Sequence, residues 1–494
     1  MLKRNTKLYY SLDDNMKFTF PEQVYVDPDK IAIAITGGGI RTMICMLGYF
    51  RCLLRYDPDF LKRTSYISTS SGGSWFNAIL TFSKCEIDEL LGESIPIDEI
   101  SSETLHDYNF NNKNYMGNVM VHCPIMETFL HAKRVGIESS EIWEYVCSKN
   151  FLYPYGLDAK FVCDSEETAQ FHKDINHINC IYPRKNFPFW ICGASIVDNS
   201  LSHTTSCEFT PLYSGIRVPN KKYGGIFFEN PGFNGRFKCI PKHDCRQNLY
   251  VSKYRNNYID NFISCSSCAY GAFFRKCYNE RLFFSDLLKN LNPKANCWGI
   301  MSNRGHETDI YDGGYIDNTG ILNLAARGCK KILAFVNCAK FNNNYCNLEI
   351  THLFGLEKEL KCSMCEFRKN SAIFSIDDWI EMRHDFEKRI KDDKIPYFYK
   401  KLKVYPNWKS GINGNYETEL LIIPLFPNHD FNNKLKINLT SPEYTELNCF
   451  PNFELFYFKE GIEINFTKMQ VNMLSTYCDW ILQKVIEEKP DFFN

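Results

Sequence analysis

The feature that most constrains the fold is an apolar run at residues 31–36 that leads into three consecutive glycines at 37–39. The run, IAIAIT, is rich in β-branched residues and short enough for one buried strand. After the glycines, apolar residues recur at helical spacing, at Met43, Met46, Leu47, Phe50, Leu53 and Leu54. The segment therefore predicts a strand, a tight glycine loop and a helix with one buried face.

The same order of elements returns twice along the chain. Residues 65–69 are typical of a strand, 70–73 (SSGG) of a tight turn, and 74–80 of a helix. A third strand is expected at 332–336, after a helix near 321–327. Strands that alternate with helices indicate the α/β class with a mostly parallel central sheet.

The 494 residues exceed the usual size of one domain, so the chain needs either a second domain or a large core with insertions. Residues 85–295 are irregular and rich in aromatic residues and cysteine, which favours extra strands and a cap inserted into the core. We expect a short N-terminal extension over 1–30 and a single domain over 31–494, ending in a helix at 469–488. The expected architecture is a three-layer α/β/α fold with a large cap.

Charge and hydropathy exclude several classes of protein. The formal net charge is −1, whereas nucleic-acid binding is usually marked by a basic stripe, so no nucleic-acid partner is expected. The most apolar stretch, 187–197, is shorter than the ~20 residues that span a bilayer, so membrane contact should be peripheral. The N-terminus lacks the apolar core of a secretory signal, and the 22 cysteines are therefore expected as reduced thiols in a cytoplasmic compartment.

Two Cys-x-x-Cys pairs keep a metal-dependent scaffold open as an alternative. They are Cys265/Cys268 and Cys362/Cys365, and Cys239, His243 and Cys245 precede the first pair. Such thiolate and imidazole groups could assemble a structural zinc site. Because 22 cysteines produce these spacings by chance, we expect no metal and no cofactor.

Ser71 lies where an α/β fold would place a nucleophile. A serine on a sharp turn from strand to helix projects its hydroxyl from the sheet edge, usually within G-x-S-x-G. Here Thr69 occupies the position of the first glycine, while Gly73 supplies the second. Shifting the frame by one residue makes Ser70 the rival nucleophile.

The glycine loop offers donors for a negative charge. Gly37, Gly38 and Gly39 precede a helix, where unobstructed backbone N–H groups suit an oxyanion or a phosphate. A nucleotide is the alternative ligand, but the loop lacks both the P-loop ending and the G-x-G-x-x-G spacing. Arg41 follows the loop, and its guanidinium could pair with a carboxylate on its own helix.

Three motifs in this order carry a specific resemblance. G-G-G-I-R at 37–41, Y-I-S-T-S-S-G-G-S-W at 66–75 and D-G-G-Y-I-D-N at 312–318 together resemble the catalytic domain of cytosolic phospholipase A2 and the patatin-like acyl hydrolases. Looser matches are Trp75, Asn318 and the run Glu208-Phe209-Thr210-Pro211. The resemblance does not extend to the calcium-binding module of some members, so calcium-triggered recruitment is not expected.

The resemblance implies a catalytic dyad in which Ser71 is the nucleophile and Asp312 the base. It also implies oxyanion donors and a phosphate ligand, namely the N–H groups of Gly38, Gly39 and Gly72 and the side chain of Arg41. An unperturbed Asp is a weak base, with a pKa of about 3.9, so burial under the cap is expected to raise its proton affinity. His306 could complete a triad, but a locally bonded histidine is the simpler interpretation. Asp317 is expected to cap a turn.

The resulting hypothesis is a serine-dependent acyl hydrolase of the phospholipase A2 or lysophospholipase type, acting on phospholipid or lysophospholipid at a membrane surface. Transfer of the acyl group to another lipid alcohol is an alternative within the enzymes. A catalytically silent lipid-binding protein of the same fold is the alternative from another class, and Thr69 is the residue that favours it.

Overall fold

A twelve-stranded mixed sheet forms the centre of the protein. The computed structural model describes residues 2–197, 204–235, 246–251, 256–269, 291–302, 305–337, 349–356, 368, 370–454, 457–459, 462–464 and 466–494. Across the sheet the strands run β10 (Arg246–Val251), β1 (Leu2–Tyr10), β9 (Ile226–Phe228), β8 (Ser214–Ile216), β7 (Thr204–Phe209), β6 (Phe189–Val197), β3 (Tyr66–Ser70), β2 (Ile31–Ile35), β14 (Lys331–Val336), β16 (Tyr416–Pro424) and β15 (Phe398–Val404). A further strand, β13 (Tyr311–Asp312), pairs with β6.

The middle of this sheet is parallel. Strands β6, β3, β2, β14 and β16 run in one direction, each paired with the next. Their residues are almost all buried, as expected for strands covered on both faces. On both sides of this centre the sheet continues in antiparallel strands, from β7 to β10 on one side and with β15 on the other.

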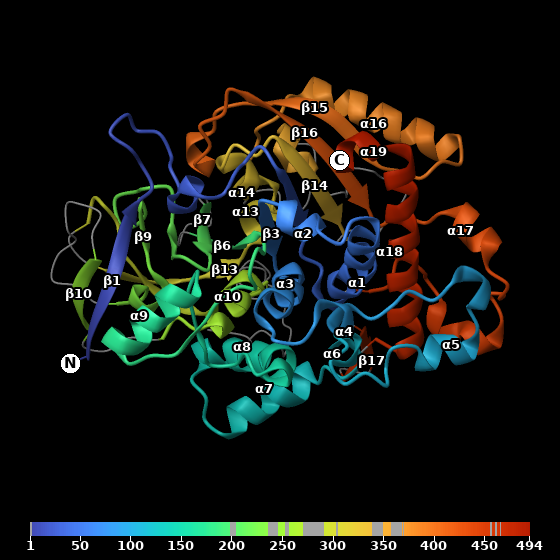
Figure 1. Cartoon of the computed structure of the whole chain (residues 1–494), viewed down its shortest axis with the longest axis horizontal. Helices are drawn as coiled ribbons and strands as arrows, with labels where there is room; N and C mark the ends of the chain where they lie inside the picture. The colour runs from blue at the N-terminus through green and yellow to red at the C-terminus, as the bar shows by residue number, and fades with distance from the viewer. Residues whose placement is uncertain are drawn as a thin grey trace, which may run out of the picture.

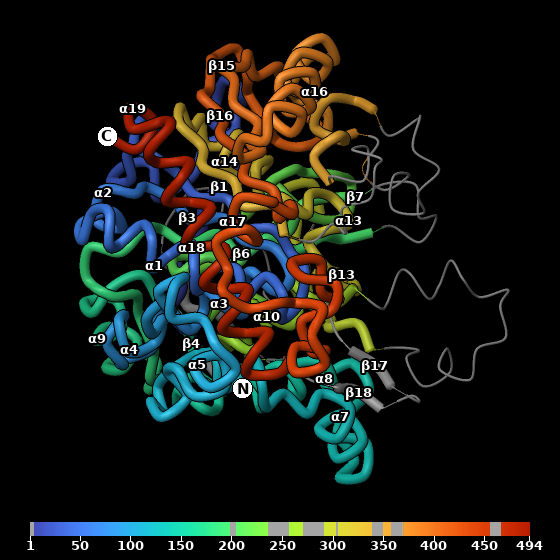
Figure 2. Tube along the Cα trace, turned by 90° about the vertical axis from the view of Figure 1, so that its right-hand side faces the viewer, coloured from blue at the N-terminus to red at the C-terminus, as the bar shows by residue number. Residues whose placement is uncertain are grey.

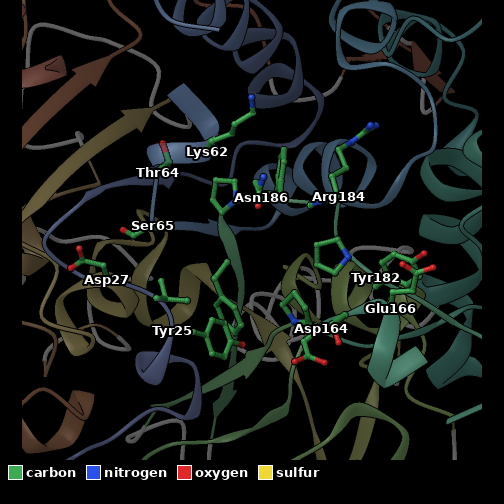
Figure 3. A pocket seen from close by; sticks show the side chains of 18 of the residues that line it. Tyr25, Asp27, Lys62, Thr64, Ser65, Asp164, Glu166, Tyr182, Arg184 and Asn186 are labelled. Carbon is green, nitrogen blue, oxygen red and sulfur yellow. The ribbon is translucent and has the colours of Figure 1, made fainter. Parts of the chain in front are cut away.

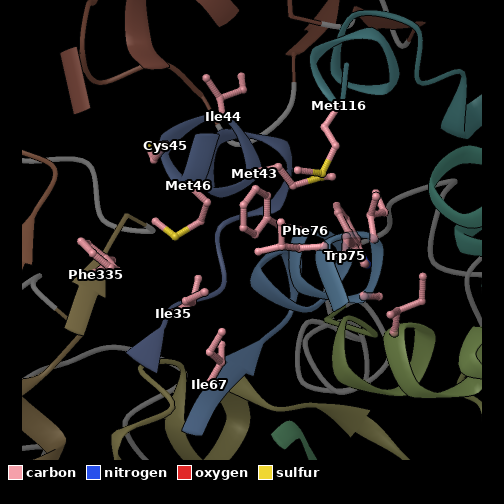
Figure 4. Close-up of a cluster of buried hydrophobic side chains, with 14 of the residues drawn as sticks. Ile35, Met43, Ile44, Cys45, Met46, Ile67, Trp75, Phe76, Met116 and Phe335 are labelled. Carbon is pink, nitrogen blue, oxygen red and sulfur yellow. The ribbon is translucent and has the colours of Figure 1, made fainter. Parts of the chain in front are cut away.

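One face of the sheet packs against three helices: the helix that follows the glycine loop, the helix that follows Ser71, and the C-terminal helix. Alternate strand residues, such as Ile33, Ile35 and Ile67, point into this layer. Figure 4 shows Ile35, Ile67 and Phe335 of the sheet facing Met43 and Met46 of α1 and Phe76 of α3. The helices of this layer are α1 (Gly39–Tyr56), α3 (Gly72–Phe82), α10 (Ile259–Ser266) and α18 (Lys468–Glu488), and α1 and α18 lie side by side (Figure 1).

The opposite face carries the other set of alternate residues. Ala32 and Ala34 of β2 belong to this second core together with residues of β14 and β16. Small alanine side chains allow a helix to approach the strand closely. The helices here are α13 (Gly314–Asp317), α14 (Ile321–Ala326) and α16 (Ile376–Lys391).

The remaining helices of the described residues are mostly short and lie largely in the insertion. They are α2 (Phe60–Arg63), α4 (Ile87–Leu91), α5 (Ser102–Asp107), α6 (Gly117–Val121), α7 (Ile125–Arg134), α8 (Ser139–Cys147), α9 (Glu166–Asn176), α17 (His429–Lys434) and α19 (Pro490–Phe493). The short strand pairs are β4 (Phe161–Val162) with β5 (Cys180–Ile181), β11 (Lys294–Cys297) with β12 (His306–Asp309), and β17 (Tyr457–Lys459) with β18 (Ile462–Ile464). In Figure 2, α7 and α8 gather at one end of the molecule, opposite β15 and α16.

The expected α/β class is confirmed, with helices on both faces of a sheet whose centre is parallel. The predicted strands at 31–36, 65–69 and 332–336 and the helix at 469–488 appear as β2, β3, β14 and α18. The domain division stays a prediction, and the expected extension over 1–30 contributes strand β1 to the sheet. Within the described residues, no helix is both long and apolar enough to cross a bilayer.

A buried ion network joins the N-terminal segment to the sheet. Arg327 donates to Glu22 at 2.7 Å and to Glu208 at 2.8 Å, and Glu208 also pairs with Arg217. Arg217 and Arg327 hold the pKa of Glu208 below its ordinary value although burial opposes this. Glu208, which matched the family only loosely, therefore holds β7 to neighbouring elements.

Candidate active site

Ser71 occupies a sharp turn between β3 and α3. Its φ of 49° and ψ of −126° lie in a region that residues other than glycine seldom adopt. Gly72 is required beside it, because a Cβ there would lie 2.2 Å from the carbonyl oxygen of Gly39. The backbone thus has the strained elbow form that presents a serine hydroxyl above a sheet edge.

The elbow forms with Thr69 in place of the first glycine of the usual pattern. The Thr69 side chain is buried, accepts a hydrogen bond from Trp190 Nε1 at 2.8 Å and lies 2.8 Å from Ser74 Oγ. The hydroxyl therefore has polar partners at a position where the family pattern has no side chain.

Ser70 is the last residue of β3, and its side chain points into the protein. It is 1% exposed, and its hydroxyl has no hydrogen-bond partner among the described residues. A Cβ on Gly313 would lie 2.6 Å from this hydroxyl, so little space remains around it. Ser71 is more accessible than Ser70, which favours Ser71 over the rival frame.

Asp312 reaches the elbow along strand β6. Ser70 of β3 pairs with Gly193, and Asp312 of β13 pairs with the next residue, Ala194. Strand β13 therefore continues on the same side of β6 where β3 ends, running in the opposite direction. This register brings Asp312 beside Ser71 although the two residues are far apart in the sequence.

The carboxyl group of Asp312 is buried and accepts the N–H of Gly314 at 2.7 Å. Burial raises the pKa of Asp312 to about 6, although the Gly314 N–H and a hydrogen bond with the Ser71 side chain stabilise the ionised form. Nearby Glu349 raises this pKa further, and Arg368 lowers it. The expected rise in proton affinity through burial is thus present.

The glycine loop and the elbow bring two helix N-termini together. Gly39 is the first residue of α1 and Gly72 the first of α3. The first N–H groups of a helix have no carbonyl of their own helix to bond, and they form the positive end of its dipole. Gly38 has a φ of 130°, and a Cβ on Gly37 would lie 2.8 Å from Ser71 Cβ. The glycine loop therefore lies beside Ser71, and the role of its N–H groups as oxyanion donors stays a prediction.

Arg41 is completely buried one turn into the same helix. Its Nε donates to the carbonyl oxygen of Asn337 at 2.9 Å, and its Nη1 donates to the carbonyl oxygen of Phe453. The guanidinium thus holds two main-chain segments near the glycine loop. Its role as a phosphate ligand stays a prediction.

His306 lies in β12 and is hydrogen-bonded to Ser302 at 3.2 Å. Apart from burial, the largest effects on the pKa of Asp312 come from Gly314, Ser71, Glu349 and Arg368. Asp317 accepts the N–H groups of Thr319 and Leu322 and contacts His352, so it caps a turn as expected.

Sequence reasoning missed three residues next to Ser71 and Asp312. The carbonyl oxygen of Ser266 accepts the N–H groups of both Ser71 and Gly313, each at 3.1 Å. Arg368 donates to the Gly314 carbonyl at 2.6 Å and contacts Glu349. A lone serine at a helix end or a distant Arg and Glu carries no local signal, since only the folded chain brings them to Asp312.

Figure 3 shows a surface cavity of about 840 Å³. It is lined by Thr64 and Ser65, which precede β3, and by Phe189, the first residue of β6. It therefore opens near the amino ends of the parallel strands. Ser71 follows a carboxyl end, where α/β folds bind their substrates.

The zinc alternative falls partly outside the described residues. Five of its candidate ligands lie outside the described ranges, namely Cys239, His243, Cys245, Cys362 and Cys365. Cys265 and Cys268 are buried, and within the described ranges no group of three His, Cys, Asp or Glu residues could hold a metal ion.

No family model matches the chain. A segment of 107 residues is 34% identical to the "Putative meiotic phospholipase SPO1" of Saccharomyces cerevisiae, covering 19% of this chain and 17% of the yeast protein. A solved structure of human GIVD cytosolic phospholipase A2 matches with a TM-score of 0.47 and 13% identity, over 94% of this chain and 62% of the human one. A second human structure, with methyl gamma-linolenyl fluorophosphonate, gives a TM-score of 0.43 at 13% identity, over 98% and 60%.

Both comparisons name phospholipases. The name of the yeast protein agrees with the resemblance that the three motifs carry. The chain spans about three fifths of the human chains, and its match covers about a sixth of the yeast protein.

Proposed function

We propose that this protein hydrolyses fatty-acyl esters of glycerophospholipids or lysophospholipids, with Ser71 as nucleophile and Asp312 as base. The observation that carries the proposal is the meeting of a serine at a positive φ with a buried carboxyl group whose pKa is raised to about 6. A general base is most effective when its pKa lies near the working pH.

In the first step, Asp312 takes the hydroxyl proton while Ser71 Oγ attacks the carbonyl carbon of the ester. The oxygen that becomes negative is stabilised by the N–H groups of Gly38, Gly39 and Gly72, at the positive ends of two helices. The tetrahedral intermediate then collapses, and protonated Asp312 returns its proton to the leaving alcohol oxygen. An acyl-serine remains.

In the second step, Asp312 takes a proton from water, and the resulting hydroxide attacks the acyl-serine. Collapse of this intermediate returns the proton to Ser71 Oγ and releases the fatty acid. The same carboxyl group acts as base and acid in both halves, which a pKa near 6 permits.

We propose that the protein lies in the cytoplasm and contacts a membrane surface peripherally. Its substrate enters the site from that surface. The aromatic residues of the insertion pack near the elbow, where Trp75 stacks on Phe151 with ring centroids 4.2 Å apart. This packing supports a cap that shields the reaction from water. Arg41 is the proposed phosphate ligand, which requires it to exchange its main-chain partners for the headgroup.

The decisive experiment combines covalent labelling with lipid hydrolysis. The purified full chain is treated with a fluorophosphonate probe, the modified residue is mapped by mass spectrometry, and fatty-acid release from phosphatidylcholine and lysophosphatidylcholine is measured. We expect modification of Ser71 and release of fatty acid. Lipid binding without either would favour the silent lipid-binding protein, and acyl transfer to an added alcohol in preference to water would favour the acyltransferase.

A further inference from the structure

Three hydroxyl groups form a continuous hydrogen-bonded chain behind the elbow. Thr69 Oγ1 lies 2.8 Å from Ser74 Oγ, and Ser74 Oγ lies 2.9 Å from Ser266 Oγ. Trp190 Nε1 donates to Thr69 at one end, and Ser266 donates to the carbonyl oxygen of Gly193 at 2.7 Å at the other. All three hydroxyl-bearing residues are buried.

The direction of the donors in this chain is fixed by its two ends. An indole N–H can only donate, and a carbonyl oxygen can only accept. Because the single proton of Ser266 is used on Gly193, Ser74 must donate to Ser266. Thr69 must then donate to Ser74 while it accepts from Trp190. Every hydroxyl proton of the chain is therefore assigned.

The chain of hydroxyl groups ends at the backbone N–H of Ser71, the proposed nucleophile. Ser71 N–H donates to Ser266 Oγ at 3.0 Å, in addition to the Ser266 carbonyl at 3.1 Å. Ser266 Oγ thus donates one bond and accepts two, which uses its full capacity. Since the carbonyl of Ser266 also binds Gly313 N–H, this residue sets the elbow relative to the end of strand β13, which carries Asp312.

We propose that Thr69, acting through Ser74 and Ser266, is a positioning residue that holds Ser71 at its strained φ and in register with Asp312. The proposal rests on the proposed function for its catalytic consequence. A backbone in a rarely adopted conformation persists only when its surroundings fix it. Thr69 thereby places a hydroxyl that supports the turn at the position of the first glycine of the elbow. Its presence there is therefore no argument for a catalytically silent protein.

The test compares Thr69→Val, which keeps the shape but removes the hydroxyl, with Thr69→Ser, which keeps the hydroxyl. For Thr69→Val we expect kcat to fall about tenfold with KM unchanged, as for the loss of one buried hydrogen bond. We also expect faster hydrogen exchange in the peptide that contains Ser71. Thr69→Ser should stay within about twofold of the wild type in kcat.

Two further variants separate positioning from general loss of stability. Ser74→Ala breaks the chain in the middle but leaves Thr69 as acceptor for Trp190, so it should reproduce the Thr69→Val effects without stranding the indole. Thr418→Val is the matched control, because Thr418 is a buried threonine on β16 whose hydroxyl has no partner among the described residues. It should change neither kcat nor exchange at the elbow.

Unchanged exchange and turnover in both Thr69→Val and Ser74→Ala would overturn the positioning role, as would a Thr69→Ser enzyme as impaired as Thr69→Val. A wild-type chain that neither labels at Ser71 nor hydrolyses lipid would instead overturn the proposed function. Hydrogen exchange would still decide, in that case, whether the hydroxyl chain holds the elbow.

Discussion

Ser70 and Asp312 lie end to end along strand β6, paired with the consecutive residues Gly193 and Ala194. This arrangement places the carboxyl group of Asp312 next to Ser71, with no other strand or helix between them. It explains how a serine and an aspartate can form a two-residue site, and it makes the roles of individual residues testable.

Ser71→Ala should abolish fluorophosphonate labelling and lipid hydrolysis, because it removes the nucleophilic oxygen. Ser70→Ala is the matched control, since the Ser70 hydroxyl is buried and should leave most of both activities in place. Labelling and fatty-acid release are measured on the two variants side by side. Modification of Ser70 in the wild type would transfer the nucleophile to the preceding residue.

Asp312→Asn should lower kcat on the order of 10³-fold or more, within the range seen when a member of a catalytic triad is lost. His306→Ala should lower it less than about tenfold, because a local hydrogen bond contributes only ~1 kcal/mol. Both are measured as steady-state turnover of correctly folded protein. Equal damage from the two substitutions would replace the dyad with a triad.

The pH profile of kcat/KM should rise through a midpoint near 6, because Asp312 must be ionised to accept the proton of Ser71 and its pKa is raised to about 6. Burial removes most of the advantage in mild acid that an ordinary carboxyl would have over an imidazole, whose pKa is near 6.5. Profiles at several temperatures identify the group, since carboxyl ionisation has a small enthalpy and imidazole ionisation a large one. A midpoint that shifts strongly with temperature would indicate a histidine.

Asp312→Asn should also stabilise the folded protein above pH 6. The raised pKa means that the folded state resists ionisation of Asp312, so this residue favours folding fully below its unfolded pKa and less as pH rises through about 6. The difference in unfolding free energy should reach on the order of 2–3 kcal/mol at pH 8. Denaturant unfolding at pH 8 and pH 4 measures it, and a gain of the same size at both values would rule out this cause.

Arg41→Lys should reduce turnover of phospholipid far more than turnover of a small neutral ester, if the guanidinium exchanges its carbonyl partners for the phosphate. A guanidinium grips phosphate through two parallel hydrogen bonds that an ammonium cannot reproduce. The two substrates are compared at saturating concentration. Equal losses on both would assign Arg41 to its observed contacts with Asn337 and Phe453 alone.

The sequence predicted the parts of the fold whose signals are local. Strands β2 and β14 are mostly apolar runs, β3 is a short β-prone run before a glycine turn, and α18 has a helical pattern, so each was expected within one or two residues of its position. Strand β1 was missed because its run carries Lys and Arg residues. One of these, Arg4, is buried and donates to the carbonyl oxygen of Pro231 at 3.0 Å, a partner that no local pattern reveals.

The candidate site divides in the same way. Ser71, Asp312 and the glycine loop stand in motifs that the chain displays in order. Ser266, Glu349 and Arg368 lie in no such motif, and only the folded chain brings them next to Ser71 and Asp312. Thr69, a departure from the usual pattern, gained its explanation from Trp190, which is more than a hundred residues away.

Strand β15 ends the sheet, and in the described part of the chain it has a paired strand on one side only. Its sequence, FYKKLKV, places the exposed Lys401 and Lys403 along this open border, whereas Lys400 pairs with Asp378 and Glu381. Unpaired backbone groups at such a border can recruit a strand of a second copy and start aggregation, and a row of like charges opposes this. The open side of β15 is therefore protected by repulsion between copies, a protection that weakens as salt screens the lysines.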